Sequence, residues 1–220
     1  RKHSLRASVT SELILQDVHV PATALLPGAS GLSGPLSCLT QARYGIAWGA
    51  VGAAMACYDE VRQYGATRVQ FGKPIASFQL YQAKLANMLT EITKAQLVNL
   101  RLGRLKEANK ATAQQVSFAK RNACHEALEI ARAARDMLGA NGISDEYQTM
   151  RHMCNLESVK TYEGTHNIHT LVLGEVSLDG SIQPTRGVLP IVAAARRWGV
   201  RSVLLPATLA GAGLVLTGIG

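Results

Sequence analysis

The sequence predicts a mainly α-helical protein: an antiparallel helical bundle preceded by the last strands of a β domain. Alanine and leucine, which favour helices, are abundant, and only 5% of the 220 residues are aromatic. From Cys38 to about Leu138, apolar residues recur at the i, i+3, i+4 spacing of amphipathic helices. Short breaks rich in glycine and proline separate these segments, and short connections are typical of antiparallel neighbours.

Residues 1–28 are expected to be the end of a middle β domain. Apolar and polar residues alternate over residues 11–20, as in a strand, until Pro21 stops the pattern. The alternation slips by one position near Asp17, which indicates a bulge or a turn. So short a strand portion is not stable alone, so we expect the rest of that domain to be missing.

Five helical segments follow a linker at residues 27–35. They are expected at about 38–66, 77–109, 112–138 and 145–152, and after Thr165 as a candidate N-cap. The inward stripe of the second is Leu85, Met88, Leu89, Ile92 and Ala95, and that of the third is Val116, Ala123, Ala127, Ile130 and Ala134. The first contains Gly45, Gly49 and Gly52. Glycine weakens a helix, so these positions indicate close helix contact or the approach of a ligand.

The net charge of +8 is spread along the chain without a dense basic run. This favours phosphate-bearing small ligands over nucleic acid as partners. The four cysteines are far apart and form no CxxC pair, which is typical of buried free thiols in a reducing compartment. The uncharged run 202–220 contains Pro206 and several glycines, so a membrane span is not expected.

Glu163 is the main candidate for catalysis. It lies between Tyr162 and Gly164, just ahead of a helix and with few charged neighbours. A carboxylate in apolar surroundings suits a general base that removes a weakly acidic C–H proton, and Gly164 lets a thioester come close. The alternative is an acidic residue favoured by the dipole of the following helix.

A second group surrounds the break after the first helix. Arg68, Phe71 and Gln79 offer a guanidinium for phosphate, a ring for a planar cofactor and an amide for hydrogen bonds. The alternative is a helix-end arginine and a phenylalanine in the core.

Two further patterns are weaker. The run Gly139 to Gly142 offers backbone amides to a pyrophosphate or an adenine, or else only ends a helix. His166 and His169 are spaced as two metal ligands on one helix face, but no third ligand follows, so no metal site is expected.

Six motifs occur together in order and spacing. They are SLRAS (4–8), LLPGASGLSGP (25–35), ARYGIAWGA (42–50), RVQFGKPIASFQLYQAKLANMLTEIT (68–93), ARDMLGANGISDEY (134–147) and YEGTHNIHTLVLG (162–174). Together they resemble the acyl-CoA dehydrogenase flavoproteins, and more narrowly their glutaryl-CoA dehydrogenase branch, over about residues 2–174. The C-terminal helical domain of that family would occupy residues 29–175.

The resemblance implies FAD as the cofactor and assigns roles to matching positions. Glu163 corresponds to the catalytic base and Arg43 to the arginine that supports its loop, and Gly164 beside the base is expected to let the thioester come close. Arg68, Phe71 and Gln79 correspond to FAD contacts made across a dimer interface, Gly139 and Gly142 to the adenine side, and Thr165 to a residue near the flavin phosphates. Some relatives carry the base on the first helix instead, where this sequence has Ala42.

The implied reaction is FAD-dependent dehydrogenation and decarboxylation of glutaryl-CoA to crotonyl-CoA, within fatty acid and lysine degradation. Electron-transfer flavoprotein is the implied acceptor, a homotetramer the implied assembly, and the bacterial cytoplasm or the mitochondrial matrix the implied location. The alternatives are a short-chain acyl-CoA oxidase or dehydrogenase of the same family, or a non-catalytic oligomerisation module. About half of a full-length enzyme is absent, including the part that recognises the distal carboxylate, so we expect incomplete activity.

The last segment does not continue the family. Residues 174–207 resemble the Lon-like domain of magnesium-chelatase-type AAA ATPases. Residues 176–220 are therefore expected to be an unrelated tail, either fused to the helical domain or joined to it by an assembly artefact.

Overall fold

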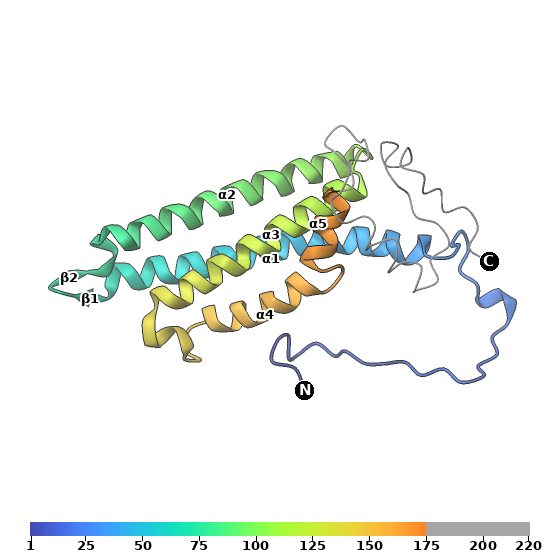
Figure 1. The fold of residues 1–220 in the computed structure, drawn as a ribbon, viewed down its shortest axis with the longest axis horizontal. Helices are drawn as coiled ribbons and strands as arrows, with labels where there is room; N and C mark the ends of the chain where they lie inside the picture. Colours follow the sequence, from blue (N-terminus) through green and yellow to red (C-terminus); the bar gives the residue numbers. More distant parts are fainter. Residues whose placement is uncertain (175–220) are drawn as a thin grey trace, which may run out of the picture. The chain divides into compact units, whose positions relative to one another are not determined.

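The computed structural model describes residues 1–174, and the predicted tail lies outside them. Residues 1–166 form one compact unit, and a second unit begins at Asn167. The first unit is a bundle of long helices, which confirms the predicted fold class (Figure 1).

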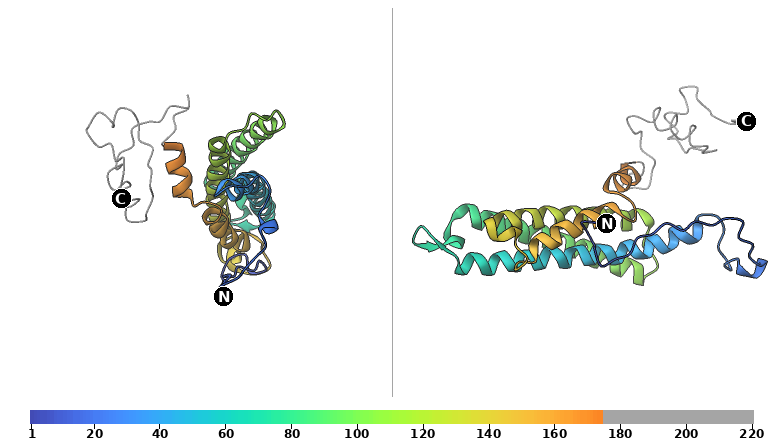
Figure 2. Two further views of the ribbon diagram at one scale, coloured as in Figure 1. Left: turned by 90° about the vertical axis from the view of Figure 1, so that its right-hand side faces the viewer. Right: turned by 90° about the horizontal axis from the view of Figure 1, so that it is seen from below.

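Four helices build the bundle, and a fifth follows it. They are α1 (Ser33–Thr67), α2 (Gln79–Glu107), α3 (Ala113–Met137), α4 (Thr149–Thr161) and α5 (His166–Gly174). Between them lie the strands β1 (Val69–Gln70) and β2 (Lys73–Pro74) and the 3-10 turns η1 (Ala22–Ala24), η2 (Ile75–Ser77) and η3 (Gly139–Ile143). The α3 helix packs against α1, α2 and α4, and the two views in Figure 2 show α1, α2 and α3 running side by side.

The core lies between these helices and consists mostly of small and aliphatic side chains. All five residues of the predicted inward stripe of α3 are buried, and on α2 Met88, Ile92 and Ala95 are buried. Leu85 lies partly buried against the core, but Leu89 remains 49% exposed. The helical period therefore identified the core face, although α2 leaves several apolar side chains exposed.

Local sequence explains where the long helices turn. Between β1 and β2, Phe71 and Gly72 both have positive φ, 52° and 78°, as a two-residue type I′ hairpin requires. At the start of α3, Thr112 and Gln115 form a reciprocal capping box, which satisfies two free backbone N–H groups.

The N-terminal segment differs from the expectation. Residues 11–20 form no strand and are exposed, because the described residues offer no neighbouring strand to take up their backbone hydrogen bonds. The turn expected near Asp17 is present, since this residue has φ 50°. Only the first residues are tied down: Ser4 Oγ and the Leu5 N–H donate to the Asn155 backbone oxygen and side-chain Oδ1 at 3.3 and 2.8 Å.

The fourth helix also differs, because it continues to Thr161 rather than ending near His152. Glu60 of α1 caps its first turn, accepting from the N–H groups of Gln148 and Thr149 at 2.9 Å each. A carboxylate at a helix N-terminus satisfies free donors and complements the dipole. This cap comes from another helix, so local sequence could not predict it.

Candidate active site

The connection from α4 to α5 has an unusual backbone. Tyr162 ends α4 in an extended conformation, and Glu163 and Gly164 follow with φ 56° and 98°. Glycine takes positive φ freely, but a glutamate there costs about 1–2 kcal/mol and needs its surroundings to hold it. We call residues 162–165 the base loop.

Two cations from different helices hold the backbone of the base loop. Arg43 of α1 donates from Nε to the carbonyl of Glu163 at 2.7 Å. Lys120 of α3 donates from Nζ to the carbonyls of Tyr162 at 2.9 Å and Gly164 at 2.8 Å. The carbonyls of three consecutive residues are therefore each bound by a charged donor, and such hydrogen bonds are the stronger ones in proteins.

These hydrogen bonds involve the backbone of the base loop and not the side chain of Glu163. It is half-buried, and its Oε2 is buried without a hydrogen-bond partner among residues 1–174. A buried, unpartnered carboxylate oxygen in a folded domain is uncommon and marks a site for a ligand or a proton.

Burial dominates the electrostatics around the loop. It lowers the pKa of Lys120, an effect that Arg43 reinforces and that Cys124 and Glu163 oppose. It raises the pKa of the Cys124 thiol to about 11, so this thiol stays protonated at neutral pH. Burial also raises the pKa of Tyr162, with the charge of Glu163 acting in the same direction.

A cleft of about 230 Å³ lies beside the loop, between α1 and α4. Its lining is mostly small or apolar and includes the polar side chains of His152 and Asn155. The residues that line it are Gly45, Ile46, Gly49, Ala50, Ala53, His152, Asn155, Leu156, Val159 and Tyr162. No heavy atom lies within 4 Å of where a Cβ at Gly45 or Gly49 would be, with neighbouring backbone left out. These glycines therefore open space instead of allowing two helices to touch, which favours the ligand explanation of the two expected from the sequence.

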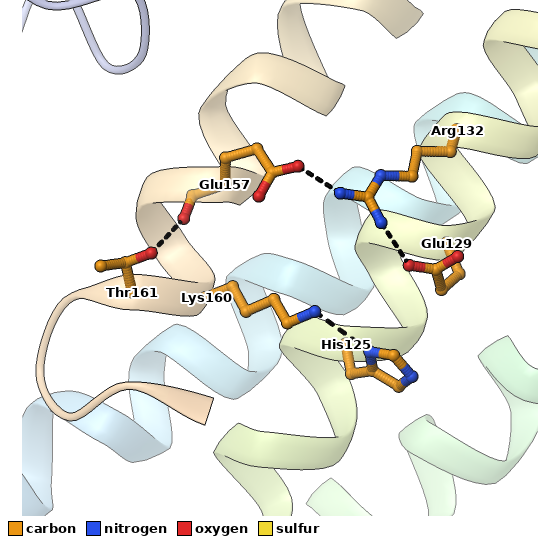
Figure 3. Close-up of polar contacts among 6 residues, drawn as sticks. All are labelled: His125, Glu129, Arg132, Glu157, Lys160 and Thr161. Atoms are coloured by element: carbon orange, nitrogen blue, oxygen red, sulfur yellow. Dashed lines mark hydrogen bonds and ion pairs between the residues drawn. The ribbon is translucent and has the colours of Figure 1, made fainter. Parts of the chain in front are cut away.

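Contacts between α3 and α4 fix the segment that leads into the loop (Figure 3). Arg132 of α3 pairs with Glu129 on its own helix and with Glu157 of α4. One turn further along α4, Lys160 Nζ lies 3.3 Å from Nδ1 of His125 on α3. The Arg132 pairs are about half exposed, so each adds little stability, and only the pair with Glu157 links the two helices.

The hairpin group lies elsewhere. Figures 1 and 2 place β1 and β2 at one end of the bundle, away from the α4–α5 connection. Phe71 lies at the hairpin tip and is 89% exposed, so it does not pack in the core. Its ring is edge-on to that of Phe78, with 6.2 Å between the ring centroids. Arg68 and Gln79 are also exposed, just after α1 and at the first residue of α2.

The Gly139–Gly142 segment lies at the hairpin end too. Asn141 donates to the hydroxyl of Tyr64, in the last turns of α1, at 3.2 Å. Gly139 has φ 60° and open space around it. Gly142 is buried, and a Cβ there would lie only 2.2 Å from the backbone oxygen of Arg135, so close packing on α3 requires this glycine.

The structure thus divides the predicted residues into two sites. Arg43, Glu163 and Gly164 come together at the base loop, where Thr165 is exposed and next in sequence. Arg68, Phe71, Gln79, Gly139 and Gly142 gather at the hairpin end. Within residues 1–174, no three His, Cys, Asp or Glu side chains are grouped as a metal ion needs, and no helix is long and apolar enough to cross a membrane.

Sequence reasoning missed Lys120. The available signal was its position: Lys120 lies four residues from Val116 and three from Ala123, so it interrupts the inward stripe of α3. A lysine at a core position is almost never buried without partners. Its partners, 42 and 44 residues away, could not be identified from the sequence.

Comparison with known proteins gives two family matches. The family described as "Acyl-CoA dehydrogenase, C-terminal domain" matches residues 29–178. A second, "Subunit ChlI of Mg-chelatase", matches residues 153–208, a span that includes most of the predicted tail.

Among solved structures, glutaryl-CoA dehydrogenase from Mycobacterium smegmatis is 52% identical with a TM-score of 0.79, covering 83% of this chain and 47% of its own. A structure of a glutaryl-CoA dehydrogenase from the same organism in complex with FADH2 is 51% identical with a TM-score of 0.78, over 80% of this chain and 45% of its own. A short-chain specific acyl-CoA dehydrogenase from Megasphaera elsdenii is 34% identical over 79% of this chain and 45% of its own length. The chain thus spans less than half the length of these relatives.

Proposed function

The chain belongs to the acyl-CoA dehydrogenase family, and from this premise we propose that it is the C-terminal part of an FAD-dependent dehydrogenase of acyl-CoA thioesters. We further propose glutaryl-CoA as the substrate. The 52% identity to a glutaryl-CoA dehydrogenase supports this choice, whereas the similarity to a short-chain specific enzyme favours a butyryl-type substrate.

One observation carries the proposal: the buried Oε2 of Glu163 has no hydrogen-bond partner within residues 1–174, while the backbone around it is held. Arg43 binds the carbonyl of Glu163 itself, and the buried Oε2 of the side chain has no partner among the described residues. A base must be positioned and unpaired at the same time. The apolar cleft, lined by the neighbouring Tyr162, offers a place for the acyl group.

In this proposal Glu163 removes the proton from the α-carbon of the thioester and keeps it on its carboxylate. Its backbone N–H donates to the thioester carbonyl and stabilises the charge that develops there. Bound FAD would supply the acceptor for the hydride that leaves the β-carbon. For a glutaryl substrate, the glutaconyl thioester formed in this way then loses its distal carboxylate as CO2, and Glu163 returns its proton to the resulting dienolate, which gives crotonyl-CoA.

The residues at the hairpin end fit FAD. An exposed ring, an exposed guanidinium and an amide at Phe71, Arg68 and Gln79 suit a planar, phosphate-bearing group. Gly139 adds open backbone at the same end. As the resemblance to the family implies, we propose that one FAD contacts the hairpin of one chain and the Thr165 region of another; the position of the hairpin away from the base loop supports this.

The test is anaerobic titration of the purified chain, supplemented with FAD, with glutaryl-CoA. Bleaching of the flavin absorbance that disappears in Glu163→Gln, and survives in the control Glu91→Gln on α2, is the expected result. Glutaryl-CoA bleaching at lower concentration than butyryl-CoA supports the dicarboxylate choice, and the reverse order overturns it. A chain that takes up no flavin refutes activity for this polypeptide.

Exposed apolar residues on α2 support a second candidate function, a self-association module. Leu80, Leu89, Leu97 and Leu100 are 84%, 49%, 60% and 43% exposed, more than a surface helix needs. In this alternative the helices assemble, as in the proposed homotetramer, without catalysis. A colourless oligomer in size-exclusion chromatography would favour the self-association module. A flavin-loaded species with one FAD per chain would favour the enzyme.

The remaining proposals concern context. An electron-transfer flavoprotein would accept the electrons, and the family has bacterial and mitochondrial members, which are the two locations considered. We also propose that residues from about 176 onward come from another family, with the match to the ChlI subunit as support.

A further inference from the structure

Lys120 is the most deeply buried cation of the described residues. Its side chain is 1% exposed in the middle of α3, between buried Ala119 and Ala123 and one turn before buried Cys124. An ammonium group placed in a helix core is unfavourable unless hydrogen bonds replace its water. The local sequence of α3 gives no reason for a charge at this position, so the reason must lie in what the side chain reaches.

The ammonium group reaches the base loop with all three of its donors matched. Its Nζ lies 2.8 Å from the carbonyl oxygen of Gly164, 2.9 Å from that of Tyr162 and 3.4 Å from that of Lys160. A protonated lysine has three N–H bonds and no acceptor. Three carbonyls converging on one nitrogen are therefore a binding site for the charged form.

The acceptors are placed around the candidate base. Tyr162 and Gly164 flank Glu163 on both sides, and the carbonyl between them is bound from α1 by Arg43. Glu163 has φ 56°, a conformation that glutamate avoids without external support. Two cations on two helices supply that support.

We propose that Lys120 is the positioning residue of the base loop, holding Glu163 in its left-handed conformation through the carbonyls on either side of it. The catalytic consequence rests on the proposed function, but the positioning itself does not. Lys120 acts through the backbone and leaves the Glu163 carboxylate free to accept a proton.

The first experiment compares Lys120→Met with Lys94→Met by NMR in the flavin-free chain. Methionine keeps the apolar stem and removes the ammonium, and Lys94 is a surface lysine of α2 paired with Glu91. We expect the carbonyl 13C signals of Tyr162 and Gly164 to move in Lys120→Met only. Amide exchange at residues 163–165 should rise on the order of tenfold or more relative to core amides of α1.

The outcome separates positioning from general stability. A uniform rise in exchange across α1, α3 and the loop would show that Lys120 only stabilises the fold, and unchanged carbonyl signals would overturn the proposal. Neither readout needs flavin or thioester, so a chain that fails to bind FAD counts against the proposed function and leaves this inference standing. In flavin-loaded protein that turns over, we expect Lys120→Met to lower kcat with little change in KM.

A second measurement tests the proposal without Lys120→Met, in case that variant does not fold. In the wild-type chain, the 15Nζ signal of Lys120 is followed while the pH is raised, together with the two carbonyl signals. The charged or titratable groups near this ammonium are Arg43 of α1, Cys124 of α3, Glu163 and Tyr162 of the loop, and His166 at the start of α5. The carbonyl signals should move with the same midpoint as Nζ; carbonyls that stay fixed while Nζ titrates would refute the contact.

Discussion

Replacing Gly142 by alanine tests whether the Gly139–Gly142 segment is constrained by packing. An added Cβ would lie 2.2 Å from the backbone oxygen of Arg135 and 3.0 Å from its carbonyl carbon. Ordinary carbon–oxygen contacts are roughly 1 Å longer than the shorter of these distances. Because Arg135 belongs to α3, whose neighbouring residues fill the core, η3 has to move instead of the helix.

The cost can be worked out from two terms. Overpacking a well-packed site costs about 1–3 kcal/mol. Moving η3 also endangers the hydrogen bond from Asn141 to Tyr64, which contributes about 1 kcal/mol. We therefore expect Gly142→Ala to lower the free energy of unfolding by about 2–4 kcal/mol, and the melting temperature by roughly 5–15 °C.

Gly52→Ala is the matched control. Gly52 lies in α1, is exposed, and has no heavy atom within 4 Å of an added Cβ, so alanine should stabilise it by about 0.5–1 kcal/mol. Urea and thermal unfolding of both variants, followed by circular dichroism, give the comparison. If Gly142→Ala is as stable as Gly52→Ala, the close contact with Arg135 is not a constraint and the packing argument fails.

Two further predictions concern the core. Gly65→Ala should lower the free energy of unfolding by about 1–3 kcal/mol, because the added Cβ would lie 2.4 Å from the Tyr81 ring. The hydroxyl of Tyr81 donates a hydrogen bond to the carbonyl of Val61, which holds the ring in place. In a double-mutant cycle, Tyr81→Phe should therefore relieve part of the loss caused by Gly65→Ala. Burial raises the pKa of Cys57 to about 12 and of Cys124 to about 11, from 9.0, so the folded chain keeps protons that the unfolded chain releases. Stability should therefore fall as the pH rises above 9, by about 3 kcal/mol at pH 10 from both thiols. Chemical unfolding at pH 8 and 10 checks this, and an unchanged slope in the double Cys→Ala variant would contradict it.

The sequence predicted the long helices well because each carries its own period and stop signals. The third helix was expected at 112–138 and is observed at Ala113–Met137, with Thr112 as its cap. The predictions failed where the decisive contact is remote. The end of α4 was placed nine residues early, since the helix is supported by Glu60 of α1 and by packing on α3. The strand at 11–20 needs a partner strand that the described residues do not contain.

The candidate site shows the same division. Glu163 could be singled out from its neighbours in sequence, and its resemblance to a known motif assigned it a role. Lys120 could not, because its function depends on three carbonyls that come near only after α3 and α4 pack together. A pattern search for charged pairs would not find it either, since its partners are backbone atoms that every residue possesses.

Arg43 and Lys120 donate to backbone carbonyls and not to the Glu163 carboxylate, and this has a chemical consequence. A simple electrostatic expectation would pair Arg43 or Lys120 with the nearby carboxylate in a salt bridge. Such a pair stabilises the ionised form and makes a carboxylate a poorer proton acceptor. Both cations instead donate to carbonyls, so they fix the position of Glu163 through its backbone, while the charge of its carboxylate still interacts with that of Lys120. Under the proposed function, the loop thereby meets two requirements of a general base separately: α1 and α3 place Glu163, and its buried Oε2 has no hydrogen-bond partner among the described residues.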